Sequence, residues 1–370
     1  MQKAIWLLAA VALNAAELAI PRIPFLPWLK PGLANIVTVL WIIKYGFKDA
    51  LLYTALRIWI SGFYFGFSLF TASLSLSGGM LATVAMGAVW IALGRRGVVG
   101  TVGMAVIGAL FHNAGQLAVV YFLMARNIGV LGQIPFMLGA SAAFGGIVGA
   151  LVPMAGRILG FDGGNDTIAN HKTANVASSR PARPVNIIDK LVIALTFAVS
   201  ISLMFVNSRY VLIAAAATFS LASLLLTPKK PFALIYPIKF YMLFLFIALT
   251  HLFFSYGTRV DIMPFMPFIT NEGIAAFISQ SLRLWCWLQT VHIFKRFGFH
   301  EMFIAALYRF FPNNSDTLEA GMIALEHFPE IVRFAKSSKK IKFTALLFHP
   351  QIALAEYVGG IASRINSKYF

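Results

Sequence analysis

The chain has few charged residues and a single cysteine. Only 12% of its 370 residues are charged, and Cys286 is the one cysteine. A soluble domain has about 25% charged residues, and one cysteine cannot form an internal disulfide or a CxxC-type metal cluster. Hydrophobic residues make up 59% of the chain, which is more than one globular core can bury. The composition therefore predicts an integral membrane protein and excludes soluble enzymes and disulfide-stabilised secreted modules.

Acidic residues and catalytic motifs are also scarce. The chain has 13 Asp and Glu residues against 30 Lys and Arg, for a net charge of +17. Glu17 and Asp49 are the only carboxylates in the first 150 residues, so a DDxxD metal–diphosphate motif and an acid–base pair are missing there. The sequence also lacks GxxxxGKS/T, HExxH and GxSxG patterns. We therefore expect no catalytic residue, metal site or cofactor, and ATP hydrolysis only by partner subunits.

Apolar segments divide the chain into two membrane-embedded halves. A transmembrane helix needs about 20 mainly apolar residues. In the first half such segments are 3–20, 32–46, 48–61, 76–94, 98–125 and 131–155. In the second half they are 187–206, 210–227, 232–256 and 273–294, followed by a charged stretch at 295–342 and an apolar segment at 343–363. We expect an all-α integral membrane protein, with a six-helix bundle followed by a half of four to five spans and cytosolic helices.

A stretch rich in Gly, Asn, Ser and Pro separates the halves and is typical of a solvated linker. The sequence predicts a membrane domain at 1–158, a linker at 159–186 and a second domain at 187–370. With a cytoplasmic N-terminus, 20 of the 30 Lys and Arg residues fall on the inner side and 5 on the outer side. Membrane proteins keep positive charge inside, so we expect a multi-pass protein with a cytoplasmic N-terminus and linker. Basic loops also explain the net charge without nucleic acid as a partner.

Small residues of the first half are candidate sites where another helix or a ligand can approach the backbone closely. A Pro-Gly pair leads into a helix with Asn35 near its start, which suits capture of a polar solute at a helix N-terminus or a plain interfacial turn. The segment 68–80 is expected to be an outer loop that runs into Gly78 and Gly79, where a helix or a ligand can approach the backbone. The GxxxG spacing at 145–149 predicts a helix-packing face.

Polar side chains inside predicted spans are candidate functional residues, because unpaired polar groups are costly in lipid. His112, Asn113 and Gln116 are close in sequence, and we expect them to share one helical face at mid-span. They either line a solute cavity or gate, or serve packing. Glu17 and Arg57 are the intramembrane charges of the first half. They either form a structural ion pair or contact the substrate.

Three stretches carry a family resemblance, KPGLANIVTVLW, LSLSGGMLATV and GALFHNAGQLAVVY. In this order and spacing, residues 1–160 resemble the Gx transporter family, often labelled heptaprenyl diphosphate synthase component I and similar to substrate-binding (S) components of energy-coupling factor (ECF) transporters. Pro31 departs from the family, which usually has an aliphatic residue there. The resemblance implies a substrate-binding domain. Its candidate substrate-binding residues are Asn35, Gly78, Gly79, His112, Asn113, Gln116, Glu17 and Arg57. The aspartate-rich motif of a prenyl synthase is missing.

Residues 185–365 resemble the transmembrane (T) component of ECF transporters, a family that includes the cobalt-transport protein CbiQ. In that family two Ala-Arg-Gly-like motifs on cytosolic coupling helices dock onto ATPase subunits. The nearest candidates here are Arg309, Arg333 and Lys336. Residues 299–340 alternate apolar and basic positions, as expected for helices along a membrane surface. Their basic residues either contact the ATPases or bind anionic lipid head groups.

These resemblances lead to one main hypothesis and two alternatives. The chain is expected to be a membrane subunit of an ECF-type ABC transporter in a bacterial inner membrane, fusing an S-like module to a T-like scaffold and driven by separate ATPase subunits. The solute is a vitamin-like molecule, a flavin or a prenyl precursor. One alternative is a non-catalytic membrane scaffold for prenyl or quinone biosynthesis. The other is a secondary transporter with Glu17 or His112 as proton site.

Overall fold

The computed structural model describes residues 2–17, 31–65, 68–161, 186–227, 236–260 and 269–325. Within these ranges the chain is built from helices, and a single bridge between Arg259 and Thr270 is its only β pairing. This confirms the all-α class. Residues 162–185 of the predicted linker (159–186), the apolar segment at 343–363 and the proline-rich turn before residue 31 lie outside the described residues.

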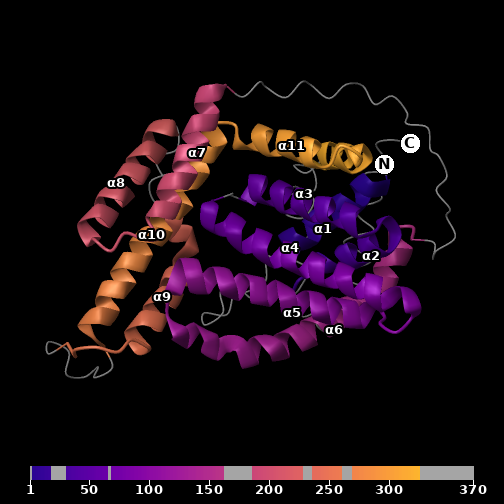
Figure 1. Ribbon diagram of the computed structural model, residues 1–370, viewed down its shortest axis with the longest axis horizontal. Coiled ribbons are helices and arrows are strands. Elements are labelled where there is room, and N and C mark those ends of the chain that lie inside the picture. Colours follow the sequence, from indigo (N-terminus) through magenta and orange to yellow (C-terminus); the bar gives the residue numbers. More distant parts are fainter. Residues whose placement is uncertain are drawn as a thin grey trace.

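The N-terminal half is a set of helices connected by short turns. They are α1 (Gln2–Glu17), α2 (Asn35–Tyr45), α3 (Phe47–Phe65), α4 (Leu69–Ala92), α5 (Thr101–Val119) and α6 (Ile134–Ile158), with short helical segments at Gly94–Arg96, Val120–Ala125 and Ile128–Gln133. Gly46, at a φ of 87°, separates α2 from α3 because only glycine adopts this backbone conformation readily. In Figure 1, α3, α4, α5 and α6 lie one after another as neighbouring rods.

The segment 68–80 is helical, which corrects the expected outer loop. The Ser68 side chain accepts a hydrogen bond from the Thr71 backbone N–H, and the Thr71 side chain accepts one from the Ser68 backbone N–H. This capping box satisfies the free N–H groups at a helix start and so fixes the beginning of α4. Glycines that weaken an isolated helix are tolerated here because neighbouring helices pack against them.

The C-terminal half surrounds one long helix. Its elements are α7 (Ile187–Ser202), α8 (Arg209–Leu226), a turn at Tyr236–Phe240, α9 (Tyr241–Phe253), α10 (Asn271–Arg296), α11 (Phe299–Phe310) and a further helical stretch at 315–325. The buried Arg283 of α10 donates hydrogen bonds to the backbone oxygens of Leu203 (3.0 Å) and Val206 (2.6 Å). These bonds explain how α10 carries an arginine inside an apolar half, because buried charges need hydrogen-bond partners.

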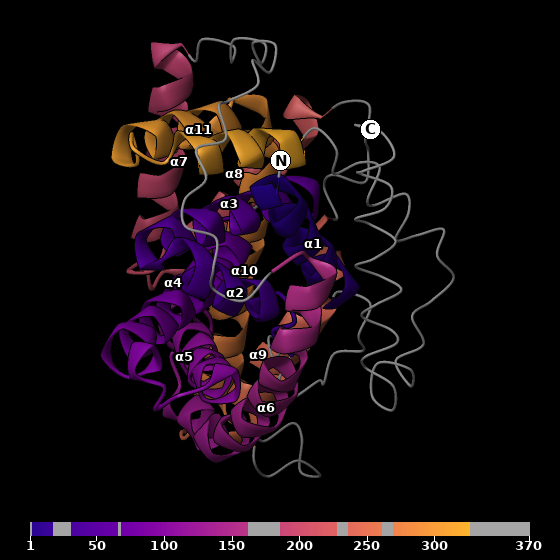
Figure 2. The same ribbon diagram turned by 90° about the vertical axis from the view of Figure 1, so that its right-hand side faces the viewer.

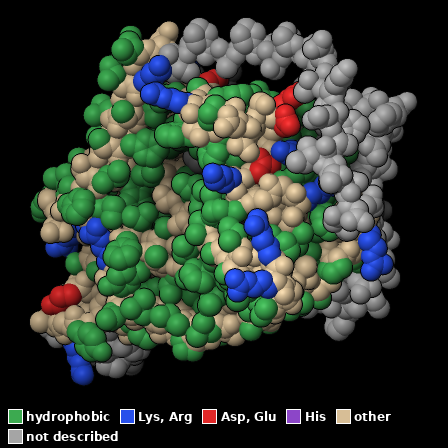
Figure 3. Space-filling model, turned by 45° about the vertical axis from the view of Figure 1, so that its right-hand side comes forward, with side chains coloured by type: hydrophobic (Ala, Val, Ile, Leu, Met, Phe, Trp, Pro, Cys, Tyr) green, Lys and Arg blue, Asp and Glu red, His purple; other side chains and the backbone are tan. Residues whose placement is uncertain are grey.

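Four described helical stretches are long and apolar enough to cross a membrane. They are Leu69–Arg96, Thr101–Ala125, Ile128–Ile158 and Arg209–Leu226. Other predicted spans are shorter, as α2 and α9 are, or more polar, as α10 is. Figure 3 shows a largely hydrophobic surface on the described residues, with Lys and Arg scattered over it. A membrane protein exposes such a surface to lipid, which confirms the class that the composition predicted.

The helices of the two halves run in different directions. In Figure 1, the axes of α3 to α6 cross those of α7 and α10, and Figure 2 shows the same arrangement turned by 90°. The described residues of the two halves contact each other in several places. The ends of α4 and α5 pack against α9 and α10 through Phe70, Val120, Phe246 and Trp287, and α11 lies along α3.

Candidate functional site

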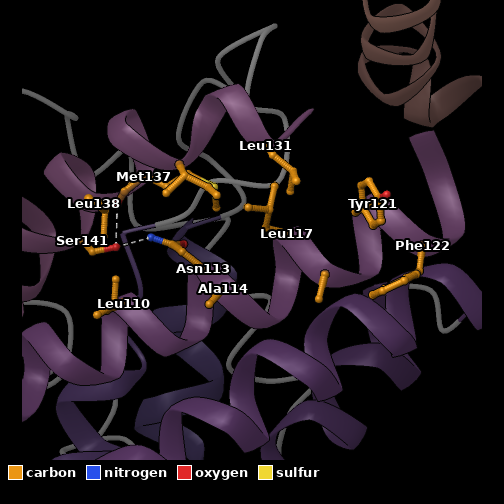
Figure 4. Close-up of a pocket in the computed structure, with 12 residues that line it drawn as sticks. Leu110, Asn113, Ala114, Leu117, Tyr121, Phe122, Leu131, Met137, Leu138 and Ser141 are labelled. Carbon is orange, nitrogen blue, oxygen red and sulfur yellow. Dashed lines mark hydrogen bonds between the residues drawn. The ribbon is translucent and has the colours of Figure 1, made fainter. Parts of the chain in front are cut away.

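A cavity of about 420 Å³ lies between α5 and α6. Its lining is almost entirely apolar and includes Leu110, Leu117, Leu131, Met137 and Leu138. Figure 4 shows the polar pair Asn113 and Ser141 at one end and Tyr121 and Phe122 at the other. We call this cavity the α5–α6 groove. Ligand pockets in proteins have volumes of about 300–1,000 Å³ with a few placed polar groups, so its size and chemistry suit a small ligand.

The orientation of the Asn113 amide follows from its partner. Ser141 Oγ donates its only hydrogen to the Met137 backbone oxygen at 2.7 Å. It can therefore only accept from Asn113, whose Nδ2 lies at 2.8 Å. This places Asn113 Oδ1 away from Ser141, and that buried oxygen has no hydrogen-bond partner among the described residues. Asn113 lines the groove and is 4% exposed, so its Oδ1 is a buried, desolvated acceptor beside the polar end of the groove.

The three polar residues of α5 do not share one face, which corrects the sequence prediction. A Cβ on Gly78 of α4 would lie 2.9 Å from Gln116 Cγ and 3.0 Å from the His112 backbone oxygen. Asn113 instead contacts Ser141 of α6. Residues i and i+4 lie on the same side of a helix, whereas residue i+1 is rotated by about 100°. Thus His112 and Gln116 face α4, and Asn113 faces the groove.

The glycine pair of α4 lies between two helices. Gly78 faces α5, and a Cβ on Gly79 would lie 2.8 Å from Ile58 Cδ1 and 3.6 Å from Arg57 Nη2 of α3. The pair thus lets α4 approach both neighbours closely. The buried guanidinium of Arg57 lies 5.9 Å from the centre of the Tyr53 ring. Arg57 and Gly79 therefore lie close together between α3 and α4, whereas the groove lies between α5 and α6.

Glu17 and Asn35 lie near the start of α2. The Glu17 carboxylate accepts a hydrogen bond from the Leu33 backbone N–H, and the Asn35 backbone N–H donates to the Gly32 oxygen at 2.8 Å. Both side chains are buried. Neither lines the groove, so the structure distributes the predicted substrate-binding residues over three places.

Asp49, at the start of α3, is the centre of a polar cluster that the sequence did not reveal. Its carboxylate accepts hydrogen bonds from Lys3 Nζ (2.9 Å) and Trp41 Nε1 (3.0 Å). It also accepts from two residues of the other half, Asn314 Nδ2 (2.6 Å) and Thr317 Oγ1 (2.8 Å). Asp49 is 5% exposed. Its carboxylate therefore ties α1 and α2 to the segment after α11. We call these five residues the Asp49 cluster.

A second contact fastens α11 itself to α3. The Trp59 ring stacks on Phe303 and His300, with centroid distances of 4.2 and 5.1 Å. Leu307 of α11 and Leu318 of the following helix are buried in the core that α1, α2, α3 and α6 form. Sequence patterns missed this contact because α11 reads as a surface helix, whose apolar side could equally have faced lipid.

The predicted ATPase-docking residues are described only in part. Arg309 is exposed on α11. Arg333 and Lys336 lie outside the described residues.

The contact between α3 and α11 should weaken in acid. His300 Nδ1 accepts the Trp59 indole N–H at 2.5 Å, so this nitrogen must be unprotonated. Burial lowers the pKa of His300, and the nearby Glu301 carboxylate offsets part of that effect. The unfolded chain therefore takes up the proton first as the pH falls below about 6.5, and folding stability falls with it.

The measurement is the thermal unfolding of the purified chain between pH 7.5 and 5.5, beside His300→Phe, which keeps a ring but cannot titrate. We expect the melting temperature of the parental chain to drop with acidification by several degrees more than that of the variant. If the melting temperatures of the two proteins fall in parallel with pH, protonation of His300 does not explain the loss of stability.

Comparison with known proteins gives a family match for the N-terminal half. Residues 7–154 match the family described as heptaprenyl diphosphate synthase component I. No curated protein and no solved structure matches the chain. The match confirms the family resemblance of the N-terminal half. It ends before α7, so the resemblance of the second half to a T component stays a prediction.

Proposed function

We propose that this chain is a membrane subunit of an ECF-type ABC transporter in a bacterial inner membrane. The N-terminal half binds a small solute, the C-terminal half is the coupling scaffold, and separate ATPase subunits supply energy. In this proposal the N-terminus and the linker are cytoplasmic, and the chain itself catalyses no reaction. The matched family supports a membrane component, and the coupling role rests on the structure of the second half.

The observation that carries the proposal is the position of α11. One side of this helix is fastened to the N-terminal half through Trp59, Phe303 and Leu307, while Arg309 remains exposed. A helix held in this way can pass a movement of a partner bound at its exposed side to the solute-binding half. The crossing of the helix directions in Figure 1 supports the same mechanism, because α4 to α6 and α7 to α10 cannot all stand upright in one bilayer.

The test is purification of the tagged chain from gently solubilised native membranes, with mass spectrometry of the proteins that accompany it. We expect a stoichiometric pair of ATPase subunits. Uptake by cells should continue under an uncoupler while ATP is kept high. Loss of uptake under that condition would favour a secondary transporter, and recovery of the chain without ATPases would contradict the coupling role.

Replacing Arg309 with Glu should reduce recovery of the ATPase pair at least about tenfold, because a charge reversal at an interface costs several kcal/mol. The matched control is Arg209→Glu, which reverses an exposed arginine at the start of α8. Both variants should fold as the parental chain does. Equal recovery of ATPases with the two variants would show that Arg309 is not part of the docking surface.

A second candidate function follows from the name of the matched family. The chain would then be a non-catalytic membrane scaffold for an enzyme of prenyl or quinone biosynthesis, with the groove holding the hydrocarbon. Co-purification of a soluble prenyltransferase that is inactive alone would favour this role over transport.

A further inference from the structure

We propose that the α5–α6 groove binds an uncharged amphiphile with one hydroxyl head group and a long hydrocarbon chain. Asn113 Oδ1 accepts the hydrogen bond of the hydroxyl, and the apolar lining holds the chain. This inference rests on the proposed function, since it names the class of solute that the N-terminal half takes.

The shape and lining of the groove select a hydrocarbon chain. The groove runs from the buried pair Asn113 and Ser141 to Tyr121 and Phe122 (Figure 4). Phe122 is 61% exposed and Leu138 is 49% exposed, so the groove opens sideways among apolar side chains that face lipid in a membrane. A ligand can therefore enter from the bilayer without passing through water. A compact polar solute would leave most of the apolar side chains of the groove without an apolar contact.

The polar end of the groove selects the head group. Ser141 uses its hydrogen on the Met137 oxygen, so the unused group is the acceptor Asn113 Oδ1. A buried acceptor without a partner costs stability, and a ligand hydroxyl or amide N–H supplies the missing donor. An ether or ester oxygen cannot do so, because it has no hydrogen to donate.

The absence of cations near the groove excludes an anionic head group. The described residues that line it include no Lys, Arg or His. A phosphate or carboxylate placed beside Asn113 Oδ1 would be a desolvated charge next to an acceptor, which is strongly unfavourable. The groove therefore discriminates between a long-chain alcohol and the phosphate ester of the same alcohol.

The experiment compares three matched probes on the full chain in lipid nanodiscs. They are a photoreactive hexadecanol, its methyl ether and its phosphate monoester, and the readouts are the dissociation constant and the site of cross-linking. We expect the alcohol to bind about fivefold more tightly than the ether, which is the factor that one hydrogen bond of average strength supplies. The phosphate should bind more weakly than the alcohol, and cross-links should map to α5 and α6.

Two variants and one control locate the binding. Asn113→Leu should remove the preference for the alcohol over the ether while keeping chain binding. Leu138→Trp fills the groove at an exposed position and should lower binding of all three probes at least tenfold. Ile147→Trp is the matched control, because Ile147 is similarly exposed on α6 (43% against 49% for Leu138) but does not line the groove. It should bind the probes as the parental chain does.

Three outcomes would overturn the proposal. Equal binding of alcohol and ether would mean that Asn113 makes no hydrogen bond to the ligand. Tighter binding of the phosphate would mean an anionic substrate. Unchanged binding in Leu138→Trp would mean that the probes occupy the lipid belt around the protein. ATPase recovery is measured on the same preparations, so a failed probe test with ATPases present rejects the ligand class alone, and probe binding without ATPases rejects the coupled transporter alone.

Discussion

Replacing Asp49 with Ala should detach α11 and the helix at 315–325 from the N-terminal half. The carboxylate is the common acceptor for Lys3, Asn314 and Thr317. Removing one partner of a buried ion pair costs about 3–5 kcal/mol, because the other charge stays behind without compensation. We expect the loss of folding free energy in Asp49→Ala to lie near the lower end of this range, since Lys3 is 21% exposed and recovers some hydration.

The measurement is hydrogen–deuterium exchange of the full chain in detergent, read by mass spectrometry over residues 299–325. Exchange there should become much faster in Asp49→Ala, and the melting temperature should fall. Asp316→Ala is the control, because it removes a carboxylate from the same segment at an exposed position. Asp49→Asn keeps one acceptor oxygen and should give an intermediate result. Protection at the parental level in Asp49→Ala would show that the aromatic contact of Trp59 alone holds the segment.

Replacing Gly145 with Val should prevent the close packing of α5 and α6. A Cβ at Gly145 would lie 2.5 Å from the Cα of Val106, and one at Gly149 would lie 2.4 Å from the Cα of Val102. Both obstructing atoms belong to the backbone of α5, so no rotamer change relieves the clash. Overpacking of a well-packed interior costs about 1–3 kcal/mol and sometimes more. Here the helices themselves must separate, so we expect the upper end of that range.

Gly146 offers a control on the next residue of the same helix. A Cβ there meets nothing within 4 Å, so Gly146→Val should fold normally, and Gly146→Ala should stabilise the helix slightly. The measurement is the yield and melting temperature of monodisperse protein for each variant. Similar behaviour of Gly145→Val and Gly146→Val would contradict the GxxxG packing face. Because α5 and α6 also form the groove, a folded Gly145 variant should lose binding of the hexadecanol probe.

The sequence predicted those features that depend on local pattern. Apolar runs placed α8 and α10 within about two residues of their observed ends, and the GxxxG spacing identified the packing face of α6. The capping box that begins α4 is also present in the sequence, as Ser68 and Thr71, but the uncharged small residues around it favour a loop. A test for capping residues would have corrected that prediction.

Features that join distant segments could not be predicted in the same way. The acceptor Asn113 was a candidate, whereas its partner Ser141 is an ordinary small residue of an apolar helix until the two helices are packed. In the sequence, Asp49 stands out only as one of the two carboxylates of the first 150 residues. Its isolation between Glu17 and Asp162 in so long a stretch was a signal, but its partners Asn314 and Thr317 come from the other half. Their meeting depends on tertiary packing, which local sequence patterns do not specify.

The Asp49 cluster also sets the order of events during synthesis of the chain. Asp49 and Thr317 are 268 residues apart. Ribosomes add about 5–20 residues per second, so the carboxylate waits roughly 15–50 s for this partner. Over that interval the core surface that Leu307 and Leu318 finally cover is open to lipid or to insertion factors. The N-terminal bundle is thus inserted early but completed late, and a ribosome that stalls before residue 317 leaves it unfinished.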